Sequence, residues 1–437
     1  MMALFLVVLL GITGFSVDMG HVMWVQRQLQ SAADAAALAG AEDVVSAPGN
    51  AVTLANTYSA SRGQKNAFLA SNVSTTATLK CLTVSVTFPT CSGGTYNAIL
   101  VTEQTEVQMW FTQILGIKTA TVVAQSMASA KGGQSQSLDI MVVLDTTASM
   151  NTADSNCSGG STRIACAKYG VIQLLTGLNP QLDWLGVMVF PGYNTTGQAN
   201  SQSTCSPTRS GIAKYAPYNS LSPPYYTVAA PDNTFKSGPS AKTLATSSSV
   251  VIAAGGGTCG TSGGIQAVGG VGTDYGQAIL GAEKVLANDG HTKAQKVIVF
   301  LSDGDANASS SNITGGLSAV NQCQQAVAAA KAAALQGMWV YSVAYGSSTA
   351  GNGGSCSTDK NSNLGTTTVA GYSTTVNGKG QSACWTMGQI ASDPSKFYSD
   401  NAAGCVGTGG NDKDLTNLFK SISASLTMPR LIPTNST

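Results

Sequence analysis

The sequence predicts a mixed α/β protein: a largely parallel sheet with helices on both faces, preceded by a long N-terminal helix and a small antiparallel β unit. Three observations carry this prediction. From residue 138 onward, short apolar runs alternate with helical patterns, which is typical of parallel strands joined by helices. Residues 67–130 alternate apolar and polar side chains, as strands with one solvent face do. The first residues are apolar and continue into an Ala-rich amphipathic pattern.

The composition indicates an exported protein with 437 residues, enough for two or three domains. Charged residues make up 10% and the net charge is +1, so the basic patch of a nucleic-acid-binding protein is not expected. The chain has ten cysteines without a C-x-x-C pair, and two histidines, which argues against zinc. An even number of cysteines in Gly/Ser/Thr-rich loops indicates disulfides made outside the cytoplasm.

The positions of the cysteines suggest some pairs and leave others open. Two bracket an expected hairpin, two flank a segment just after residue 150, and two share one long insertion; these are Cys81 and Cys91, Cys157 and Cys166, and Cys205 and Cys259. The sequence alone does not pair the remaining four. The pairs that we favour among them are Cys356–Cys384 and Cys323–Cys405.

Residues 1–46 are predicted to form one helix that serves as membrane anchor and stalk. Residues 1–17 are almost wholly apolar, at the lower edge of the ~17–25 residues that span a bilayer. They lack the basic start and the A-x-A-like cleavage site of a secretory signal peptide. Small side chains then recur at helical spacing and allow close approach of a second helix; they are Leu29, Ala32, Ala33, Ala36, Ala37 and Gly40. The alternative is that this stripe packs inside the chain's own core.

This N-terminal region resembles the start of TadE/TadG-type Tad pilus-assembly proteins. An apolar segment is followed by Asp18, Gly20, Arg27, the pair Leu29–Gln30 and the run AADAAALAGA at residues 32–41. The resemblance implies a bacterial protein of the cell envelope, in the periplasm or on the cell surface. It also implies partners among pilus or envelope proteins, and a role in assembling a surface filament, in adhesion, or in both.

Residues 47–130 are predicted to form the small β unit, with strand patterns in 71–80, 82–88, 97–110 and 119–130. The expected Cys81–Cys91 bridge lies within it. Residues 131–137, KGGQSQS, have the composition of a flexible linker.

Residues 138–427 are predicted to form the main α/β domain, and 428–437 a Pro-broken tail. Strands are expected at Ile140–Leu144, Trp184–Phe190, Val297–Leu301 and Trp339–Ala344, and helices at Ile164–Leu175, Tyr275–Ala287, Val320–Leu335 and Leu415–Leu426. Two insertions interrupt the pattern, near 191–270 and 346–384. Tyrosines of the first insertion either contact a partner or glycan or pack the insertion onto the sheet; they are Tyr215, Tyr218, Tyr225 and Tyr226.

A group of oxygen-bearing side chains follows the first strand of this domain. Asp145 ends the apolar run, and Thr147 and Ser149 come two and four residues later. Such hard oxygen donors suit Mg²⁺, or another divalent cation such as Mn²⁺ or Ca²⁺. Thr273 lies on a Gly-rich loop before a helix, and Asp303 follows the strand at 297–301. Because ligands bind at the carboxyl ends of strands in open α/β sheets, we expect a metal site there.

This arrangement resembles the metal-ion-dependent adhesion site (MIDAS) of von Willebrand factor type A domains. That pattern is Asp-x-Ser-x-Ser, a distant Thr, and a distant Asp in a Ser-Asp-Gly turn. It maps onto Asp145, Thr147, Ser149, Thr273 and Asp303, with Thr147 departing from the usual Ser while keeping the hydroxyl. TadG-like proteins join the same N-terminal anchor to a von Willebrand type A domain, so both halves indicate one family.

The sequence therefore predicts a binding protein and not an enzyme. The metal-bearing head would capture an acidic side chain of a protein ligand. The alternative is a pilin-like subunit that self-associates through residues 1–46 and polymerises into a filament. His21 and His291 adjoin no nucleophile motif, and neither G-x-S-x-G nor H-E-x-x-H occurs.

Overall fold

The computed structural model describes most of the 437 residues. Outside the description lie residues 1, 45–47, 69–71, 83–95, 130–136, 181, 209, 238–242, 258, 260–262, 303–304, 348, 350–355, 357–358, 360–365, 371, 376–381, 427–429 and 435–437, together with the side chains of 2–10, 366–367, 372–375, 403, 424 and 430. The chain divides into two compact units. The first contains residues 1–135 and 427–437, and the second contains 136–426.

The second unit contains a seven-stranded sheet in the order β12-β11-β8-β7-β4-β5-β6. The strands are β4 (Leu138–Asp145), β5 (Trp184–Tyr193), β6 (Tyr225–Asp232), β7 (Gln295–Ser302), β8 (Trp339–Ala344), β11 (Phe397–Ser399) and β12 (Gly410–Asn411). All neighbours pair in parallel except β5 and β6, which are antiparallel. The predicted, largely parallel sheet is confirmed, with one antiparallel edge strand that the sequence analysis placed inside an insertion.

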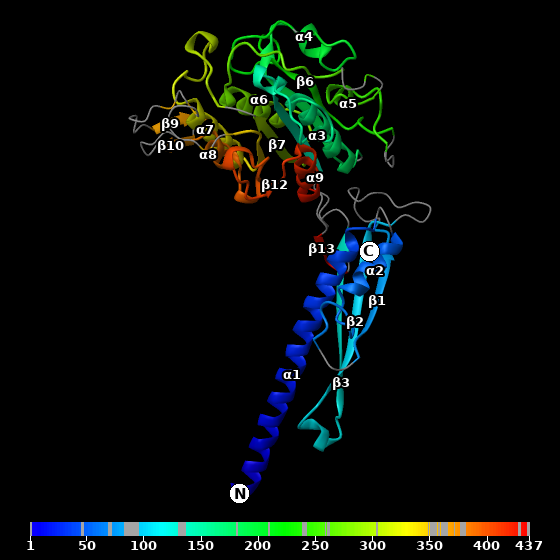
Figure 1. Cartoon of the computed structure of the whole chain (residues 1–437). Coiled ribbons are helices and arrows are strands. Elements are labelled where there is room, and N and C mark those ends of the chain that lie inside the picture. The colour runs from blue at the N-terminus through cyan, green and yellow to red at the C-terminus, as the bar shows by residue number, and fades with distance from the viewer. Residues whose placement is uncertain are drawn as a thin grey trace. The chain divides into compact units, whose positions relative to one another are not determined.

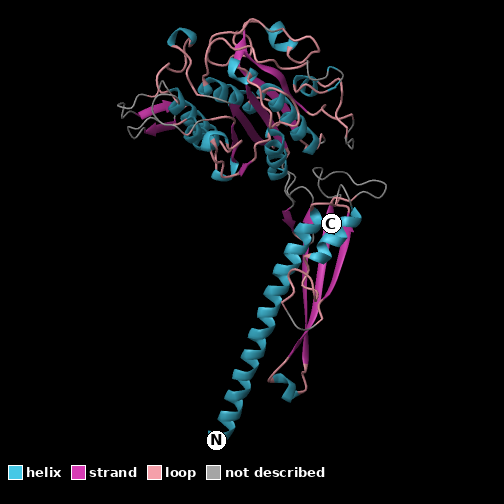
Figure 2. Cartoon of the chain, in the orientation of Figure 1, coloured by secondary structure: helices cyan, strands magenta, loops and turns pink. Residues whose placement is uncertain are grey.

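Helices cover both faces of this sheet, as predicted (Figure 2). Alternate residues of β4 point to opposite faces. Ile140 and Leu144 pack with α3 (Arg163–Gly177) and α9 (Leu415–Leu426). Met141 and Val143 pack with α6 (Tyr275–Ala287), α7 (Gln322–Leu335) and α8 (Ala383–Ile390). Shorter elements are α4 (Thr196–Ser201), α5 (Ser249–Ala253) and the hairpin β9 (Thr366–Val369) with β10 (Tyr372–Thr375).

The tyrosines of the first insertion pack inward for the most part. Tyr215 and Tyr226 are fully buried in one cluster with Phe190 of β5. Their hydroxyl groups donate to backbone carbonyls of Gly272 and Ala216 at 2.8 Å each. Burial of these two rings fixes the insertion to the sheet and leaves Tyr218 and Tyr225 half-buried.

The first unit packs one long helix along a four-stranded antiparallel sheet (Figure 1). The helices are α1 (Met2–Ala41) and α2 (Pro48–Thr57). The strand order is β1 (Ser74–Lys80), β2 (Ala98–Gln108), β3 (Thr119–Ser129) and β13 (Arg430–Ile432). Residues 428–437 were expected as a tail, but Arg430–Ile432 pair with Met127–Ser129 of β3. The predicted strand at 82–88 lies outside the described residues.

The small-residue stripe of α1 packs inside this unit. Leu29 and Ala33 contact side chains from both long strands, and Ala36 and Ala37 join Ile99 of β2 in a second cluster. Gly40 has no room for a side chain, because an added Cβ would lie 2.9 Å from the Ala51 carbonyl oxygen. Of the two alternatives for the stripe, the structure shows packing within the chain.

Two glutamines of α1 hold the helix against the sheet. The side-chain amides of Gln26 and Gln30 donate to the β3 carbonyls of Val123 and Gln125, both at 3.0 Å. Gln30 stands beside Leu29 just before the Ala-rich run at residues 32–41, and this contact gives it a structural role. Within the part of α1 whose side chains are described, and in the other described helices, no stretch is long and apolar enough to cross a membrane.

Four disulfides join cysteines in the described part of the chain: Cys157–Cys166, Cys205–Cys259, Cys323–Cys356 and Cys384–Cys405. The pairs Cys356–Cys384 and Cys323–Cys405 that we favoured from sequence are wrong. The reason lies in Asp359, whose carboxylate accepts the backbone N–H groups of Cys323 and Gln324 at 3.2 Å each. By capping α7, Asp359 brings Cys356 to Cys323. Cys91 lies outside the described residues.

Candidate metal centre

The predicted metal loop lies where the order of the sheet strands reverses. From β4 the chain proceeds to β5 on one side, and later returns to β7 on the other side of β4. In open α/β sheets the crevice at such a reversal, outside the carboxyl ends of the strands, is where ligands bind. Asp145 is the last residue of β4 and Ser302 the last residue of β7. The topology therefore brings two polar side chains together across this crevice.

The Asp145 carboxylate is the centre of a compact group of oxygens. Its Oδ1 accepts hydrogen bonds from the backbone N–H of Thr147 at 2.8 Å and from the Thr147 hydroxyl at 2.6 Å. Its Oδ2 accepts from the Ser302 hydroxyl at 2.6 Å. The Thr147 hydroxyl lies 3.0 Å from that of Ser149. The structure thus brings together three of the five predicted ligand residues, Asp145, Thr147 and Ser149.

The donor set and its spacing fit a hard divalent cation. All donors are oxygens, with one carboxylate and hydroxyl groups, as Mg²⁺ prefers. Adjacent ligands of an octahedral ion at about 2.1 Å lie about 3.0 Å apart, the separation of the Thr147 and Ser149 hydroxyls. Asp145 is fully buried and Thr147 is 6% exposed, whereas Ser149 is exposed. A cation held here would have protein on one side and access from Ser149's side.

An Asp-x-Thr turn alone does not define a metal site, because the chain contains a second such turn at Asp232. The Asp232 carboxylate accepts from the N–H and the hydroxyl of Thr234 at 2.8 and 2.9 Å, the same local pattern. Asp145 differs because Ser149 adds a further hydroxyl and Ser302 reaches it from a second strand. These additions, and not the turn, distinguish the candidate site.

Thr273 lies on the loop that precedes α6, and this loop borders the oxygen group. Gly269 at its start donates its N–H to the Thr146 carbonyl at 3.1 Å. Just after Thr273, the Tyr275 hydroxyl lies 3.4 Å from the hydroxyl of Ser302. Thr273 is 5% exposed, and its backbone N–H donates to the side-chain carbonyl of Asn307 at 3.1 Å. The fourth predicted ligand therefore stands on a loop fixed to both sides of the crevice.

Asp303, the fifth predicted ligand, lies outside the described residues. Its chain neighbour Ser302 is not among the five predicted ligands, yet its hydroxyl donates directly to Asp145. The sequence signal for this role was the Ser of the Ser-Asp-Gly motif at residues 302–304.

A second buried carboxyl group, that of Asp274, lies near the site, since Asp145 and Asp274 both act on Tyr215. Asp274 caps α6 by accepting the N–H of Gly276 at 3.0 Å, while its Oδ2 is buried without a hydrogen-bond donor among the described residues. Burial raises the pKa of Asp274 to about 7, despite hydrogen bonds from the backbone of Gly276 and Gln277. Burial, with Asp145 and Asp274 nearby, raises the pKa of Tyr215 well above its usual value. A cation would offset this concentration of carboxylates.

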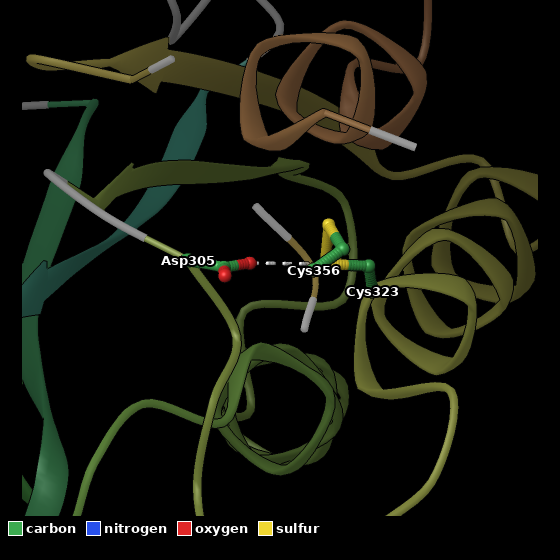
Figure 3. Close-up of side chains that lie close together, drawn as sticks. All are labelled: Asp305, Cys323 and Cys356. Carbon is green, nitrogen blue, oxygen red and sulfur yellow. Dashed lines mark hydrogen bonds between the residues drawn. A yellow bond between two sulfur atoms is a disulfide. The ribbon is translucent and has the colours of Figure 1, made fainter. Parts of the chain in front are cut away.

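A second group with metal-ligating side chains does not form a metal site. Asp305, Cys323 and Cys356 lie within 4.8 Å of one another, as Figure 3 shows. The two cysteines are joined in a disulfide, and a disulfide sulfur is not the thiolate that binds metals. The Asp305 Oδ1 lies 3.9 Å from the Cys323 sulfur.

A polar cavity of about 270 Å³ opens elsewhere on the carboxyl side of the sheet, beyond β8 and β11. Its walls include Asp154, Arg163, Tyr345, Asp400 and Lys413. The Tyr345 hydroxyl donates to Asp154, and the Arg163 guanidinium lies 5.5 Å from the Tyr345 ring centre. Burial raises the pKa of Asp400, although its carboxylate accepts the N–H of Gly346 at 2.8 Å.

Comparison with known proteins gives one family match and several distant structural likenesses. Residues 1–43 match the family described as "Putative Flp pilus-assembly TadE/G-like". No curated protein sequence matches the chain. The family match covers the N-terminal helix, so a function for the α/β unit is a matter of proposal.

Among solved structures, the chain is similar to the pilus adhesin SpaC from Lactobacillus rhamnosus GG, at 13% identity and a TM-score of 0.39. That alignment covers 78% of this chain and 34% of SpaC, so the chain spans about a third of that protein. The PilB minor pilin from Streptococcus sanguinis aligns at 12% identity and a TM-score of 0.34, covering 82% of this chain and 79% of PilB. Proximal thread matrix protein 1 from the mussel byssus, with a zinc-occupied MIDAS motif, aligns at 13% identity and a TM-score of 0.29. That alignment covers 70% of this chain and 48% of the mussel protein.

Proposed function

We propose that this protein is a component of a Tad-type pilus system at the bacterial cell envelope or surface. The match of residues 1–43 to the TadE/G-like family supports this assignment. The disulfides support a location of the body outside the cytoplasm, because such bonds persist in oxidising compartments. In this proposal the apolar start of α1 is a membrane anchor.

We infer further that the α/β unit is a metal-dependent binding head. The observation that carries this inference is the convergence of Asp145, Thr147 and Ser149 at the strand-order reversal, with Ser302 holding the second oxygen of Asp145. These side chains would hold Mg²⁺ or a related divalent cation, with Thr273 and Asp303 completing the set. The bound cation would supply a Lewis-acid position for an anionic oxygen.

The chain's own residues define which ligand fits. Asp145 is buried and held by Thr147 of its own loop and by Ser302 of β7, so it supplies fixed negative charge beneath the cation. Ser149 is exposed at the rim, where an incoming group would arrive. An Asp or Glu side chain of a partner protein would complete the coordination, because a carboxylate is a strong ligand for a hard cation. The role is binding and not catalysis.

The Mg²⁺ affinity of the full-length chain tests the metal site. Isothermal titration should show one site in the wild-type protein and none in Asp145→Asn. Asp232→Asn is the matched control, because Asp232 makes the same local hydrogen bonds without Ser149 or Ser302. Equal Mg²⁺ binding by wild type and Asp145→Asn, with both folded by circular dichroism, would refute the proposal.

The alternative, a pilin-like subunit that polymerises through α1, makes a different prediction. The small-residue stripe of α1 is already packed in its own unit, so polymerisation would need the exposed side of the helix. Electron microscopy of protein purified from cell surfaces distinguishes the two. Regular fibres built of this chain would favour the pilin-like subunit. Separate particles in membrane fragments would favour the membrane-anchored binding head.

A further inference from the structure

We propose that the tip of the β2–β3 hairpin is a second membrane contact, which enters the same lipid surface as the start of α1. We define the apolar tip as residues 110–117, WFTQILGI, which include the 3₁₀ turn η1 (Thr112–Leu115). The inference rests on the proposed anchor, and adds a partner surface that the anchor alone does not provide.

The apolar tip exposes large hydrophobic side chains that a surface turn in water would not favour. Ile114 and Leu115 are 84% and 80% exposed, and Ile117, Trp110 and Phe111 are 55%, 52% and 47% exposed. Residues 109–117 contain no charged side chain. Contiguous exposed apolar surface of this kind marks an interaction site.

Asp18 of α1 fastens the apolar tip to the helix. Its carboxylate accepts the backbone N–H groups of Trp110 at 2.9 Å, Phe111 at 3.0 Å and Thr112 at 2.7 Å. Gly14, one turn earlier, permits the approach, because a Cβ there would lie 2.9 Å from the Cβ of Phe111. The tip is therefore held beside the N-terminal half of α1 (Figure 1).

The neighbouring part of α1 is also exposed and apolar. Ile12 is 62% exposed, Phe15 52%, Met23 57% and Trp24 50%. Residues 1–17 contain no charged side chain, so the uncharged segment of the helix and the uncharged tip lie side by side. Two sequence segments about 90 residues apart thus form one apolar end of the first unit.

Three features indicate a lipid surface as the occupant. First, the rings of His21 and Trp110 stack at 4.3 Å, with Trp24 6.3 Å from His21, and such amphipathic rings favour the boundary between lipid and water. Second, apart from Asp18, whose carboxylate is bound by the N–H groups of the tip, charged side chains begin just beyond these rings, at Arg27 and Lys118, together with Glu106 on β2. The two basic residues suit a headgroup layer.

Third, six of the eight N–H groups of the apolar tip donate to acceptors within the first unit, which favours entry into lipid. Besides the three N–H groups bound by Asp18, Ile114 donates to Phe111, Gly116 to Gln113, and Ile117 to Thr112. The side-chain amide of Gln113 donates to the Trp110 carbonyl at 2.8 Å. A second copy of the chain would need no such internal pairing, because water or the partner chain would supply donors and acceptors.

Site-specific fluorescence in vesicles tests the proposal with the full-length chain. A polarity-sensitive dye is attached to Ile114→Cys, to Ile12→Cys on α1, or to Leu221→Cys as control. Leu221 is 86% exposed in the second unit, matching the 84% of Ile114. Phosphatidylcholine vesicles with brominated acyl chains should quench the dye at positions 114 and 12 several-fold more than at 221.

The outcomes separate this inference from the anchor. Quenching at 12 but not at 114 would overturn the second membrane contact without contradicting the anchor. Quenching at neither position would overturn both proposals. The dye at 114 could instead report an apolar environment without lipid, and more so at higher protein concentration. That result would overturn the lipid assignment in favour of a second copy of the chain. Asp18→Ala should reduce quenching at 114 and leave it unchanged at 12, and equal reduction at both would refute the fastening role.

Discussion

Replacing Ser302 by alanine is expected to weaken divalent-cation binding while leaving the three oxygen-bearing residues of the β4 loop in place. The Ser302 hydroxyl donates to Asp145 Oδ2 at 2.6 Å, and both residues are fully buried. A hydrogen bond to a charged group contributes about 1.5–3 kcal/mol. Since about 1.4 kcal/mol corresponds to a tenfold change in affinity, loss of this bond should weaken binding roughly ten- to hundredfold. Changes in residues that orient metal ligands generally have effects of this size.

Isothermal titration of Mg²⁺ into the full-length variants measures the effect. Ser342→Ala is the matched control, because Ser342 is fully buried in β8 and its hydroxyl has no hydrogen-bond partner among the described residues. It should bind Mg²⁺ as the wild type does. If Ser302→Ala also keeps wild-type affinity while Asp145→Asn loses it, Ser302 does not position the carboxylate and the reasoning is refuted.

Three further predictions concern stability. Burial raises the pKa of Glu103 above its usual 4.5, so the folded first unit takes up a proton at higher pH than the unfolded chain. Its thermal stability should therefore increase as the pH is lowered from above the raised pKa toward 4.5. Replacing Cys384 and Cys405 by serine should lower the free energy of unfolding by about 3 kcal/mol, because the bridge closes a 21-residue separation. Gly170→Ala should lower it by about 1–3 kcal/mol, since the added methyl group would lie 2.3 Å from the Phe419 ring.

Each of these three stability predictions has a control and a result that would contradict it. Glu103→Gln should flatten the pH dependence, and an unchanged slope would assign it to another group. Mass spectrometry of unreduced peptides should find Cys384 joined to Cys405, and a Cys356–Cys384 peptide would contradict the structure. Gly197→Ala, whose methyl group would have no atom closer than 3.9 Å, should be neutral in chemical denaturation, and an equal loss there would exclude overpacking as the cause.

Local sequence patterns predicted the regular elements of the α/β unit well. The helices at 275–287 and 415–426 have the predicted bounds, and β8 covers the predicted residues 339–344. These elements have periodicity and end signals within their own sequence. The edge strand β6 was missed, because it contains Pro231 and its pairing with β5 is irregular and long-range.

The candidate site likewise has one part that local sequence predicted and another part that it did not. The group formed by Asp145, Thr147 and Ser149 lies within one turn, so the sequence could place its oxygens together. The hydrogen bond from Ser302 depends on β7 lying beside β4, which is a property of strand order and not of either strand. The Cys323–Cys356 pair depends in the same manner on the cap that Asp359 places on α7.

The N-terminal helix shows where periodicity is ambiguous. A stripe of small residues suits another helix or the chain's own sheet equally well. Here the chain's own sheet and helix α2 occupy the stripe, and the glutamines at 26 and 30 bind an adjacent strand. Nothing in the stripe itself distinguishes the two outcomes.

The short strand β13 gives the α/β unit two covalent connections to the first unit. The chain leaves after β3 and returns to pair with that same strand, so the second unit is an insertion within the first. Two backbone connections, instead of one, therefore join the second unit to the first. One cut in either connection would leave the second unit covalently attached through the other. In the proposed role of a binding head, cleavage of a single backbone connection would therefore not release the head.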